Sequence, residues 1–168
     1  MAIQILSGMR LTPARLNALA PITDRLAADV TRTNTTNLID TLSVPVIAGA
    51  QYDVEALLFY EAPTANDAKI GFNWPSGSMV WGMLGLASGS TTAFGDIQPY
   101  AFGAPVNDQT FVLGGGGVSN QLTALMRGTL VTSLSGGNLK VRWAQNTAGA
   151  GTSAILKAGS TLQLRRIS

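Results

Sequence analysis

An alternation of apolar and polar residues near the end of the chain is the feature that most limits the fold. Leu139, Val141 and Trp143 alternate with Lys140 and Arg142. A period of two is expected of a β-strand that has one face in a core and one face in water. The pattern therefore predicts a strand that buries Trp143.

The stretch that follows predicts two further strands. A Gly-Ala-Gly loop precedes a short strand near residues 152–158, and a Gly-Ser turn leads to a strand in which Leu162 and Leu164 point one way and Gln163 and Arg165 the other. We expect the three strands to form a β meander. The alternation slips after Leu164, which predicts a bulge, a frayed end or a subunit contact.

From residue 30 onward, turn signals separate short segments that alternate as strands do. The sequence Ser-Gly-Gly-Asn at 135–138 predicts a hairpin. Pro45 has no N–H for a sheet ladder, so we expect its strand at a sheet edge, or Pro45 at the start of its strand. With about eight to ten strands and almost no helix, the predicted class is all-β, an antiparallel jelly-roll-like sandwich. The other predicted strands cover residues 31–36, 42–46, 52–61, 68–74, 78–86, 110–113 and 121–133.

Two of these strands are apolar where a solvated strand is polar. In residues 52–61 the face that carries Asp53 and Glu55 continues as Leu57 and Phe59, and residues 78–86 are apolar on both faces. Such strands lie at the centre of a sandwich or at an oligomer interface. The residues predicted for the core or a subunit interface are Leu57, Phe59, Met79, Trp81, Met83 and Trp143.

The first thirty residues differ from the rest, and the predicted domains are an N-terminal arm over residues 1–30 and a β-sandwich head over residues 31–168. Thr12 is a good helix N-cap with Pro13 in the first turn, which predicts a short helix that ends at Pro21. Residues 22–30 are expected to form a second short helix or a linker. The arm would dock on a neighbouring protein or pack on its own head, through Ile3, Ile5, Leu6, Leu11, Leu16 and Leu19.

The composition argues against an enzyme. The chain has no histidine and no cysteine, which excludes the common nucleophile-base pairs and leaves only all-oxygen metal sites. Asp53 and Glu55 share a strand face about 7 Å apart, as a glycosidase pair would, but alternating polar residues on an outer face are far commoner. We expect no catalytic residue, no metal and no cofactor.

Other candidate sites have simpler explanations. The glycine run at 114–117 lacks the Lys-Ser/Thr of a phosphate loop and is expected to form a flexible loop tip. Asp67, Asp96 and Asp108 lack the dense spacing of a calcium loop. Tryptophans form sugar platforms in some proteins, but each of the three here lies on the apolar phase of a strand, so we expect core packing: Trp74, Trp81 and Trp143.

Charge limits the partners. Only 12% of residues are charged and the net charge is +2, with the cations scattered singly apart from Arg165 and Arg166. A nucleic-acid footprint is not indicated. The low share of charge indicates a surface that other chains cover. The sequence shows neither a signal peptide nor a membrane span.

Several segments, in order, resemble a group of small virion structural proteins of tailed phages. They are GMRLTPARLNAL, YDVEALLFYEA, DAKIGFNWPSGSMVWGMLG, LKVRWAQNT and LKAGSTLQLRRI. The resemblance implies a non-enzymatic virion component, of capsid-decoration or tail-tip and fibre type, with a jelly-roll head similar to trimeric heads of the tumour-necrosis-factor type. It implies as partners other copies of the chain and the capsid or tail proteins. The protein would assemble in the host cytoplasm and reside in the virion.

A second hypothesis is a receptor-binding or carbohydrate-binding head that recognises the host surface, and it is compatible with the first. Exposed aromatic residues near amides are typical of glycan sites. The loops between residues 87 and 120 offer a sparse version, with Phe94, Tyr100 and Phe102 as the candidate receptor-loop residues and Gln98 and Asn107 as neighbouring amides.

Overall fold

The computed structural model describes residue 12 and residues 20–90, 97–102 and 107–167. Within these ranges the secondary structure is entirely strand and turn, without a helix. The strands are β1 (Ile22–Arg25), β2 (Val30–Thr33), β3 (Ile39–Val46), β4 (Gln51–Glu61), β5 (Ala68–Asn73), β6 (Ser78–Leu86), β7 (Ile97–Phe102), β8 (Thr110–Leu113), β9 (Leu122–Val131), β10 (Gly137–Gln145), β11 (Ser153–Leu156) and β12 (Thr161–Arg166).

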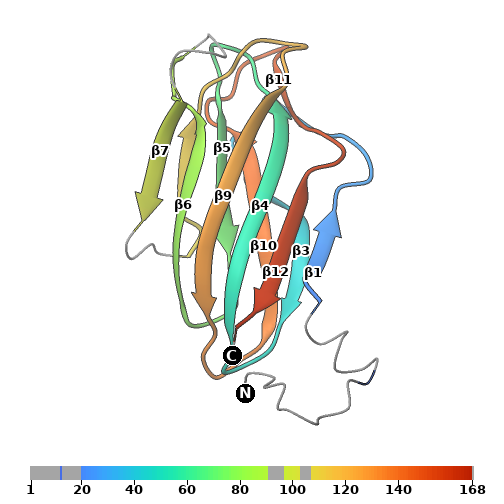
Figure 1. The fold of residues 1–168 in the computed structure, drawn as a ribbon. Helices are drawn as coiled ribbons and strands as arrows, with labels where there is room; N and C mark the ends of the chain where they lie inside the picture. The colour runs from blue at the N-terminus through green and yellow to red at the C-terminus, as the bar shows by residue number, and fades with distance from the viewer. Residues whose placement is uncertain (1–11, 13–19, 91–96, 103–106, 168) are drawn as a thin grey trace.

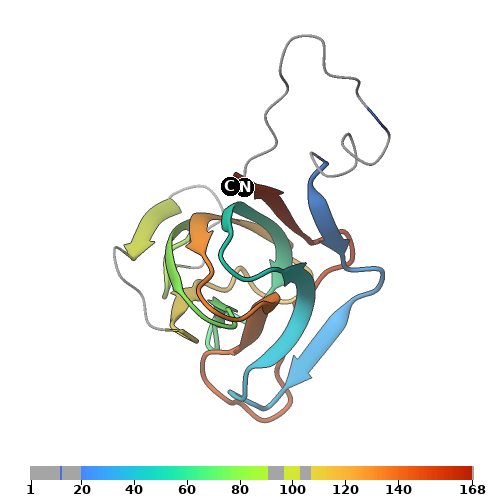
Figure 2. The same cartoon turned by 90° about the horizontal axis from the view of Figure 1, so that it is seen from below.

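The strands form two antiparallel sheets. The larger has eight strands, with the order β1-β12-β4-β9-β6-β7 and with β11 joining β2 to β4. The smaller has four strands in the order β3-β10-β5-β8. Figure 1 shows the larger sheet in front of the smaller, and the end-on view of Figure 2 shows the strands around a common interior. The all-β sandwich is confirmed.

Strands β3 to β10 pair as one long hairpin that is folded over on itself. β3 pairs with β10, β4 with β9, β5 with β8 and β6 with β7. Folding this hairpin places β10 beside β5 in one sheet and β9 beside β6 in the other. Nested pairs of this kind, closed into two facing sheets, have the jelly-roll strand order.

Four more strands widen the larger sheet beyond β4. β12 pairs with β4, and β1 pairs with β12 from Ile22 opposite Leu164 to Arg25 opposite Thr161. The expected helix or linker over residues 22–30 is therefore wrong, because this stretch contains β1 and begins β2. The helix predicted after Thr12 falls on residues 13–19, outside the described residues, so the helical arm has no support here.

Two predicted strand pairings are also wrong. The turn at 135–138 does not close a hairpin, because β9 lies in the larger sheet and β10 in the smaller. The C-terminal strands do not form a meander, because β10, β11 and β12 each pair with strands from earlier in the chain. Alternation predicted the strands themselves, but their partners come from the fold.

The core lies between the two sheets. Along β4 the inward residues are buried, from Tyr52 to Tyr60, while the alternate residues are half-buried. Trp81 packs edge-on against Phe72 and Phe111, with ring centroids 5.1 and 5.0 Å apart, a favourable aromatic geometry. The prediction of buried tryptophans is confirmed for all three: Trp74, Trp81 and Trp143.

The edge strands agree with the expectation for Pro45. β3 is an edge strand of the smaller sheet, and Pro45 lies opposite Asn138 on its single neighbour β10. At an edge, the missing N–H of proline leaves no partner unsatisfied. After Leu164 the chain stays in register with β4, with Arg166 opposite Tyr52, so the bulge and the frayed end are both wrong. Arg165, Arg166 and Ile167 are all exposed, and the subunit contact stays a prediction.

Candidate interaction surfaces

The outer face of the larger sheet carries an apolar row that crosses four strands. Leu57 on β4 lies opposite Leu125 on β9, Leu125 lies opposite Leu84 on β6, and Leu84 lies opposite Pro99 on β7. Leu84 is 45% exposed and Pro99 is exposed, while Leu57 and Leu125 are half-buried. Nothing in the sandwich core needs these side chains, because they point away from the smaller sheet.

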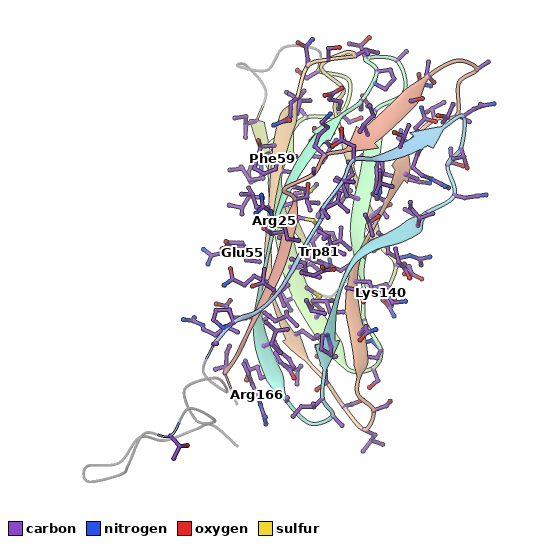
Figure 3. All side chains as sticks on the ribbon, turned by 90° about the vertical axis from the view of Figure 1, so that its right-hand side faces the viewer. Arg25, Glu55, Phe59, Trp81, Lys140 and Arg166 are labelled. Carbon is purple, nitrogen blue, oxygen red and sulfur yellow. The ribbon has the colours of Figure 1, made fainter. Side chains whose placement is uncertain are left out.

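Other apolar side chains extend this row into a patch. Val80 is 54% exposed and Ile97 is 59% exposed on the same sheet, and Phe59 lies on the outer side of β4 (Figure 3). A shallow cavity of about 340 Å³ opens between the strands, lined by Leu84, Leu86, Ile97, Leu122 and Leu125 together with Gly85, Gln121 and Thr123. We call the apolar row with Phe59 and Ile97 the apolar patch. Val80 lies apart from it, opposite Thr129 at the level of Asp53.

The exposure of β6 bears on the two explanations for a strand that is apolar on both faces, namely the centre of a sandwich and an oligomer interface. Met79, Trp81 and Met83 are buried in the core, as predicted. The opposite face of β6 is not buried by this chain, because Val80 and Leu84 are about half exposed. The centre-of-sandwich explanation is therefore wrong for that face, and the interface explanation stands as a hypothesis. Leu57 and Phe59 belong to the same outer face rather than to the core.

A charged level lies next to the apolar row, two residues along each strand. Glu55 lies opposite Arg127, and their side chains form an ion pair of 3.0 Å. One step further, Arg165 pairs with Asp53 at 3.0 Å. These groups, with Pro21 and Gln163, line a hollow of about 250 Å³.

The same ion pairs explain the two carboxylates considered as a glycosidase pair. Asp53 and Glu55 do share the outer face of β4, but each contacts its own arginine across the sheet. Exposed cross-strand ion pairs are common on solvated sheet faces. The geometry therefore assigns these residues to surface pairing.

The outer face of the smaller sheet is charged throughout its centre. Asp40 on β3 lies 2.7 Å from Lys140 and 2.7 Å from Arg142, both on β10. Arg142 also donates a hydrogen bond of 2.7 Å to Asp108, which accepts a second from Asn73. Figure 3 shows Lys140 on this side of the sandwich, with Glu55 and Phe59 on the other and Trp81 between the sheets.

This network shifts two pKa values. Partial burial raises the pKa of Asp108, but the hydrogen bonds from Arg142 and Asn73 outweigh it and hold the pKa below its ordinary value. The hydrogen bond to Asp108 likewise raises the pKa of Arg142. Both shifts show that the fold favours the charged forms of Asp108 and Arg142. Their ion pair ties the loop before β8 to β10, and the bond from Asn73 ties it to β5.

A second ionic cluster closes the turn between β11 and β12. Lys157 lies 2.6 Å from Asp29 and 3.3 Å from Glu61. The hydrogen bond from Lys157 is the main cause that lowers the pKa of Asp29, and the reciprocal bond raises the pKa of Lys157. The backbone N–H of Ala158 also donates to Asp29 at 2.8 Å. This cluster is a structural tie between the chain before β2 and the C-terminal strands.

The glycine run is a packed connection rather than a flexible loop tip, so that expectation is wrong. Gly114 and Gly115 are buried. A Cβ at Gly115 would lie 2.2 Å from the carbonyl oxygen of Pro63, which explains the requirement for glycine. The carboxylate of Asp67 accepts a hydrogen bond from the N–H of Gly115 at 3.0 Å.

The loop acids do not gather into a cation site. Asp67 binds backbone and hydroxyl donors, Asp108 binds Arg142 and Asn73, and Asp96 lies outside the described residues. Among the residues that the structure describes, no group of acidic side chains is arranged to hold a metal ion. In the same ranges no helix is suited to crossing a membrane.

One end of the sandwich exposes apolar side chains. It is the end where β12 finishes and where β3 turns into β4 and β9 turns towards β10. The backbone N–H of Ile167 donates to Gln51 at 2.8 Å there, and Gly49 donates to Ser133 at 2.8 Å. Leu134 at this end is 99% exposed. We call this the apolar end, and its exposed members are Ile47, Val131, Leu134 and Ile167.

Strand β1 starts at the side of the sandwich where the apolar end lies. β1 runs antiparallel to β12, and Ile22 lies opposite Leu164, two positions before the last residue of β12. Residues before Pro21 are thus joined to the sandwich on that side. The predicted docking residues of the arm themselves lie outside the described residues: Ile3, Ile5, Leu6, Leu11, Leu16 and Leu19.

The candidate receptor-loop residues are only partly placed. Phe94 lies outside the described residues. For Tyr100 and Phe102 the structure describes the backbone, which belongs to β7, but not the side chains. Asn107 uses its amide internally, because it donates to the carbonyl of Trp74 at 2.7 Å and accepts from the N–H of Trp74 at 3.0 Å. With all three tryptophans buried, none of them provides a sugar platform.

Comparisons with known proteins found similar solved structures only. No family model matches the sequence, and no curated protein matches it. The VP2 subviral particle of infectious bursal disease virus matches over 88% of this chain and 40% of that chain, with 10% identity and a TM-score of 0.23. The Gx strain of the same virus matches over 88% and 40%, with 11% identity and a TM-score of 0.26.

The chain spans about 40% of the length of these viral chains. At such low TM-scores the likeness does not reach a superposable fold, and no function follows from it. The jelly-roll strand order rests on the strand pairs of this chain alone.

Proposed function

We propose that this chain is a non-enzymatic structural protein of a bacteriophage virion, a homotrimer that docks through its N-terminal arm onto a larger virion assembly. The assembly is a capsid lattice that the protein decorates, or a tail tip or fibre. The observation that carries the proposal is the apolar end, which exposes Leu134 fully on the side where residues 1–20 join the sandwich.

The apolar end and the arm complement each other. Exposed apolar groups gathered at one place are typical of contact surfaces, and β1 begins on this side of the head. A partner protein that binds the arm would therefore also cover Ile47 and Leu134. The sequence resemblance to small phage virion proteins supports the same arrangement, since it includes the arm segment GMRLTPARLNAL.

A structural role also agrees with the side-chain chemistry. Ion pairs within the chain engage Asp53, Glu55, Arg127 and Arg165 on the larger sheet, and Asp40, Lys140, Arg142 and Asp108 on the side of the smaller sheet. The low share of charged residues, 12%, suits a chain that is covered on several sides within an assembly. Its partners in this proposal are other copies of itself and the capsid or tail proteins, and it acts in the virion after assembly in the host cytoplasm.

Deletion of residues 1–20 tests the proposal. The intact chain and the truncated chain are each supplied to assembling phage particles, and the amount in purified particles is measured by quantitative mass spectrometry. We expect the truncated chain to be absent from particles. Its oligomeric state should not change, so the intact and the truncated protein should each have a solution mass near three times that of their own single chain. Normal incorporation of the truncated chain would contradict the arm's role.

Leu134→Glu provides a second variant with the arm intact. It places a charge at the centre of the apolar end, at a side chain that contributes nothing to the core. We expect reduced incorporation with an unchanged unfolding midpoint. Val118→Glu, which adds the same charge at an apolar side chain that is 73% exposed at the opposite end, serves as the control that leaves incorporation unchanged.

A host-surface glycan-binding head is the second candidate function. If the apolar end is anchored, the opposite end points outward, and there the connection after β8 exposes Val118 at 73%. Binding of the purified head to host cells and to their surface polysaccharide tests this candidate. Saturable binding that is lost when residues 116–120 are replaced would support it, and no binding at all would exclude it.

A further inference from the structure

The two outer faces of the sandwich differ in a way that assigns a partner to one of them. The smaller sheet presents Asp40, Lys140 and Arg142 in mutual ion pairs, the usual state of a solvated face. The larger sheet presents the apolar patch, where Leu84 and Ile97 are each 45% exposed or more. Water contact with so many neighbouring apolar side chains is unfavourable.

We propose that the apolar patch is the surface through which copies of this chain pack together, around a rotation axis that runs parallel to the strands. The inference rests on the proposed function in taking the protein as a self-assembling virion component. It adds the face that each copy uses and the direction of the axis.

Charge complementarity identifies a second copy as the occupant. Beside the apolar row, one level of the sheet carries both Glu55 and Arg127, and the next carries both Asp53 and Arg165. When the axis lies in front of the boundary between β4 and β9, Glu55 of one copy faces Arg127 of the next copy at the same level. A partner with a predominantly acidic or basic surface would match only half of these groups.

The arrangement of levels fixes the axis. Successive outward residues on a strand are separated by about 7 Å, so the apolar row and the Glu55–Arg127 level lie at different heights along the strands. Rotation about an axis parallel to the strands keeps every level at its height. The apolar row of one copy therefore meets the apolar row of another copy, and their charged levels meet each other. A rotation axis that runs across the strands reverses the order of the levels in the second copy. Leu57 and Leu125 of one copy would then lie nearer to the Glu55–Arg127 level of the other.

Substitution in the apolar row tests the face. We expect Leu84→Glu to convert the oligomer to a monomer, measured as solution mass by light scattering, and to leave the circular dichroism of the sheets unchanged. Leu125→Glu should act in the same way. Leu134→Glu is the matched control, because it introduces the same charge at an exposed leucine of the apolar end and should keep the oligomer mass.

Single cysteines test the axis. The natural chain contains no cysteine, so Leu125→Cys and Thr129→Cys each give one thiol on the outer face of β9. A parallel axis beside β9 keeps both positions level with themselves, and we expect each variant alone to form disulfide-linked dimers on mild oxidation. An axis across the strands near Arg127 would instead link position 125 of one copy to position 129 of the other, only when the variants are mixed.

The outcomes separate this inference from the proposed function. If Leu84→Glu and Leu125→Glu keep the full oligomer mass, the apolar patch is not the contact surface. If disulfides form only when the two cysteine variants are mixed, the axis does not run parallel to the strands. A natural chain that is monomeric at high concentration overturns both. In each of these cases the incorporation experiment on residues 1–20 still decides the virion role independently.

Discussion

The carboxylate of Asp67 accepts a hydrogen bond of 3.0 Å from the backbone N–H of Gly115. Asp67 ends the turn after β4, whereas Gly115 lies in the connection from β8 to β9. The same carboxylate accepts hydrogen bonds from the N–H of Gly89 at 3.2 Å and the hydroxyl of Ser88 at 2.9 Å. One buried side chain thus ties three connections at one end of the sandwich.

We expect Asp67→Ala to lower the free energy of unfolding by about 3 kcal/mol, because it leaves the buried N–H of Gly115 without this acceptor and removes the bonds to Gly89 and Ser88. Asp67→Asn should cost less, since the amide retains one acceptor oxygen and asparagine tolerates the positive φ of 48° at this position. Urea unfolding measures both. Asp53→Ala, at an exposed ion pair, is the control and should cost at most about 1 kcal/mol. Equal losses at positions 67 and 53 would contradict the role of Asp67.

Gly128 makes room for the packing of β6 against β9. It lies opposite Trp81, and an added Cβ would come within 2.5 Å of the carbonyl oxygen of Val80. We expect Gly128→Ala to destabilise the fold by about 1–3 kcal/mol through overpacking. Gly116→Ala is a matched control, because its Cβ would meet neighbours only at 3.4 Å or more. Thermal unfolding of the two variants should separate clearly, and similar midpoints would refute the steric argument.

Acid should weaken the tie at Asp108. Its pKa is lowered in the folded chain by the bonds from Arg142 and Asn73, against the effect of burial. A carboxylate with a depressed folded pKa contributes stability above its unfolded pKa, about 3.9, and this stability is lost as pH falls through the folded pKa. Because the pair is partly exposed, we expect at most about 1 kcal/mol.

Asp108→Asn should therefore be less stable than the natural chain at pH 7 and should approach it below about pH 3. Urea unfolding between pH 2 and pH 7 measures the difference. A difference that is constant across this range would mean that the carboxylate charge is not responsible.

The buried tryptophans make a simple optical prediction. Trp74, Trp81 and Trp143 are each at most 4% exposed, so iodide, a charged quencher, should reduce the fluorescence of the folded chain very little. Unfolding in urea should raise the quenching constant several-fold. Strong quenching of the native protein would show that at least one indole reaches the surface, and would reopen the sugar-platform hypothesis.

Much of the strand content follows from alternation alone. The strands around Leu42, Tyr52, Phe72 and Trp143 were expected within a few residues of their observed positions. Pro45 correctly predicted an edge strand, because its missing N–H is a local property that excludes a central position. The buried tryptophans followed from the apolar phase of their strands.

Other elements have no comparable local pattern. β1 (Ile22–Arg25) is short and mostly exposed, and it is a strand because β12 offers it a free edge. β7 (Ile97–Phe102) contains Pro99 and lies at the opposite edge. The burial of Gly115 likewise depends on Pro63 and Asp67, which are distant in sequence.

The sequence by itself determined most of the strands, though not β1 and β7, the apolar face of those strands, and that the chain lacks histidine and cysteine chemistry. The tertiary structure decided which strands pair. A period of two states only that a side chain points to one side or the other, so it cannot tell a hairpin at 135–138 from a crossing between sheets. Only in the assembled sheets do Leu57, Leu125 and Leu84 align into one row on an outer face, because register across strands is set by the whole hairpin as it folds over.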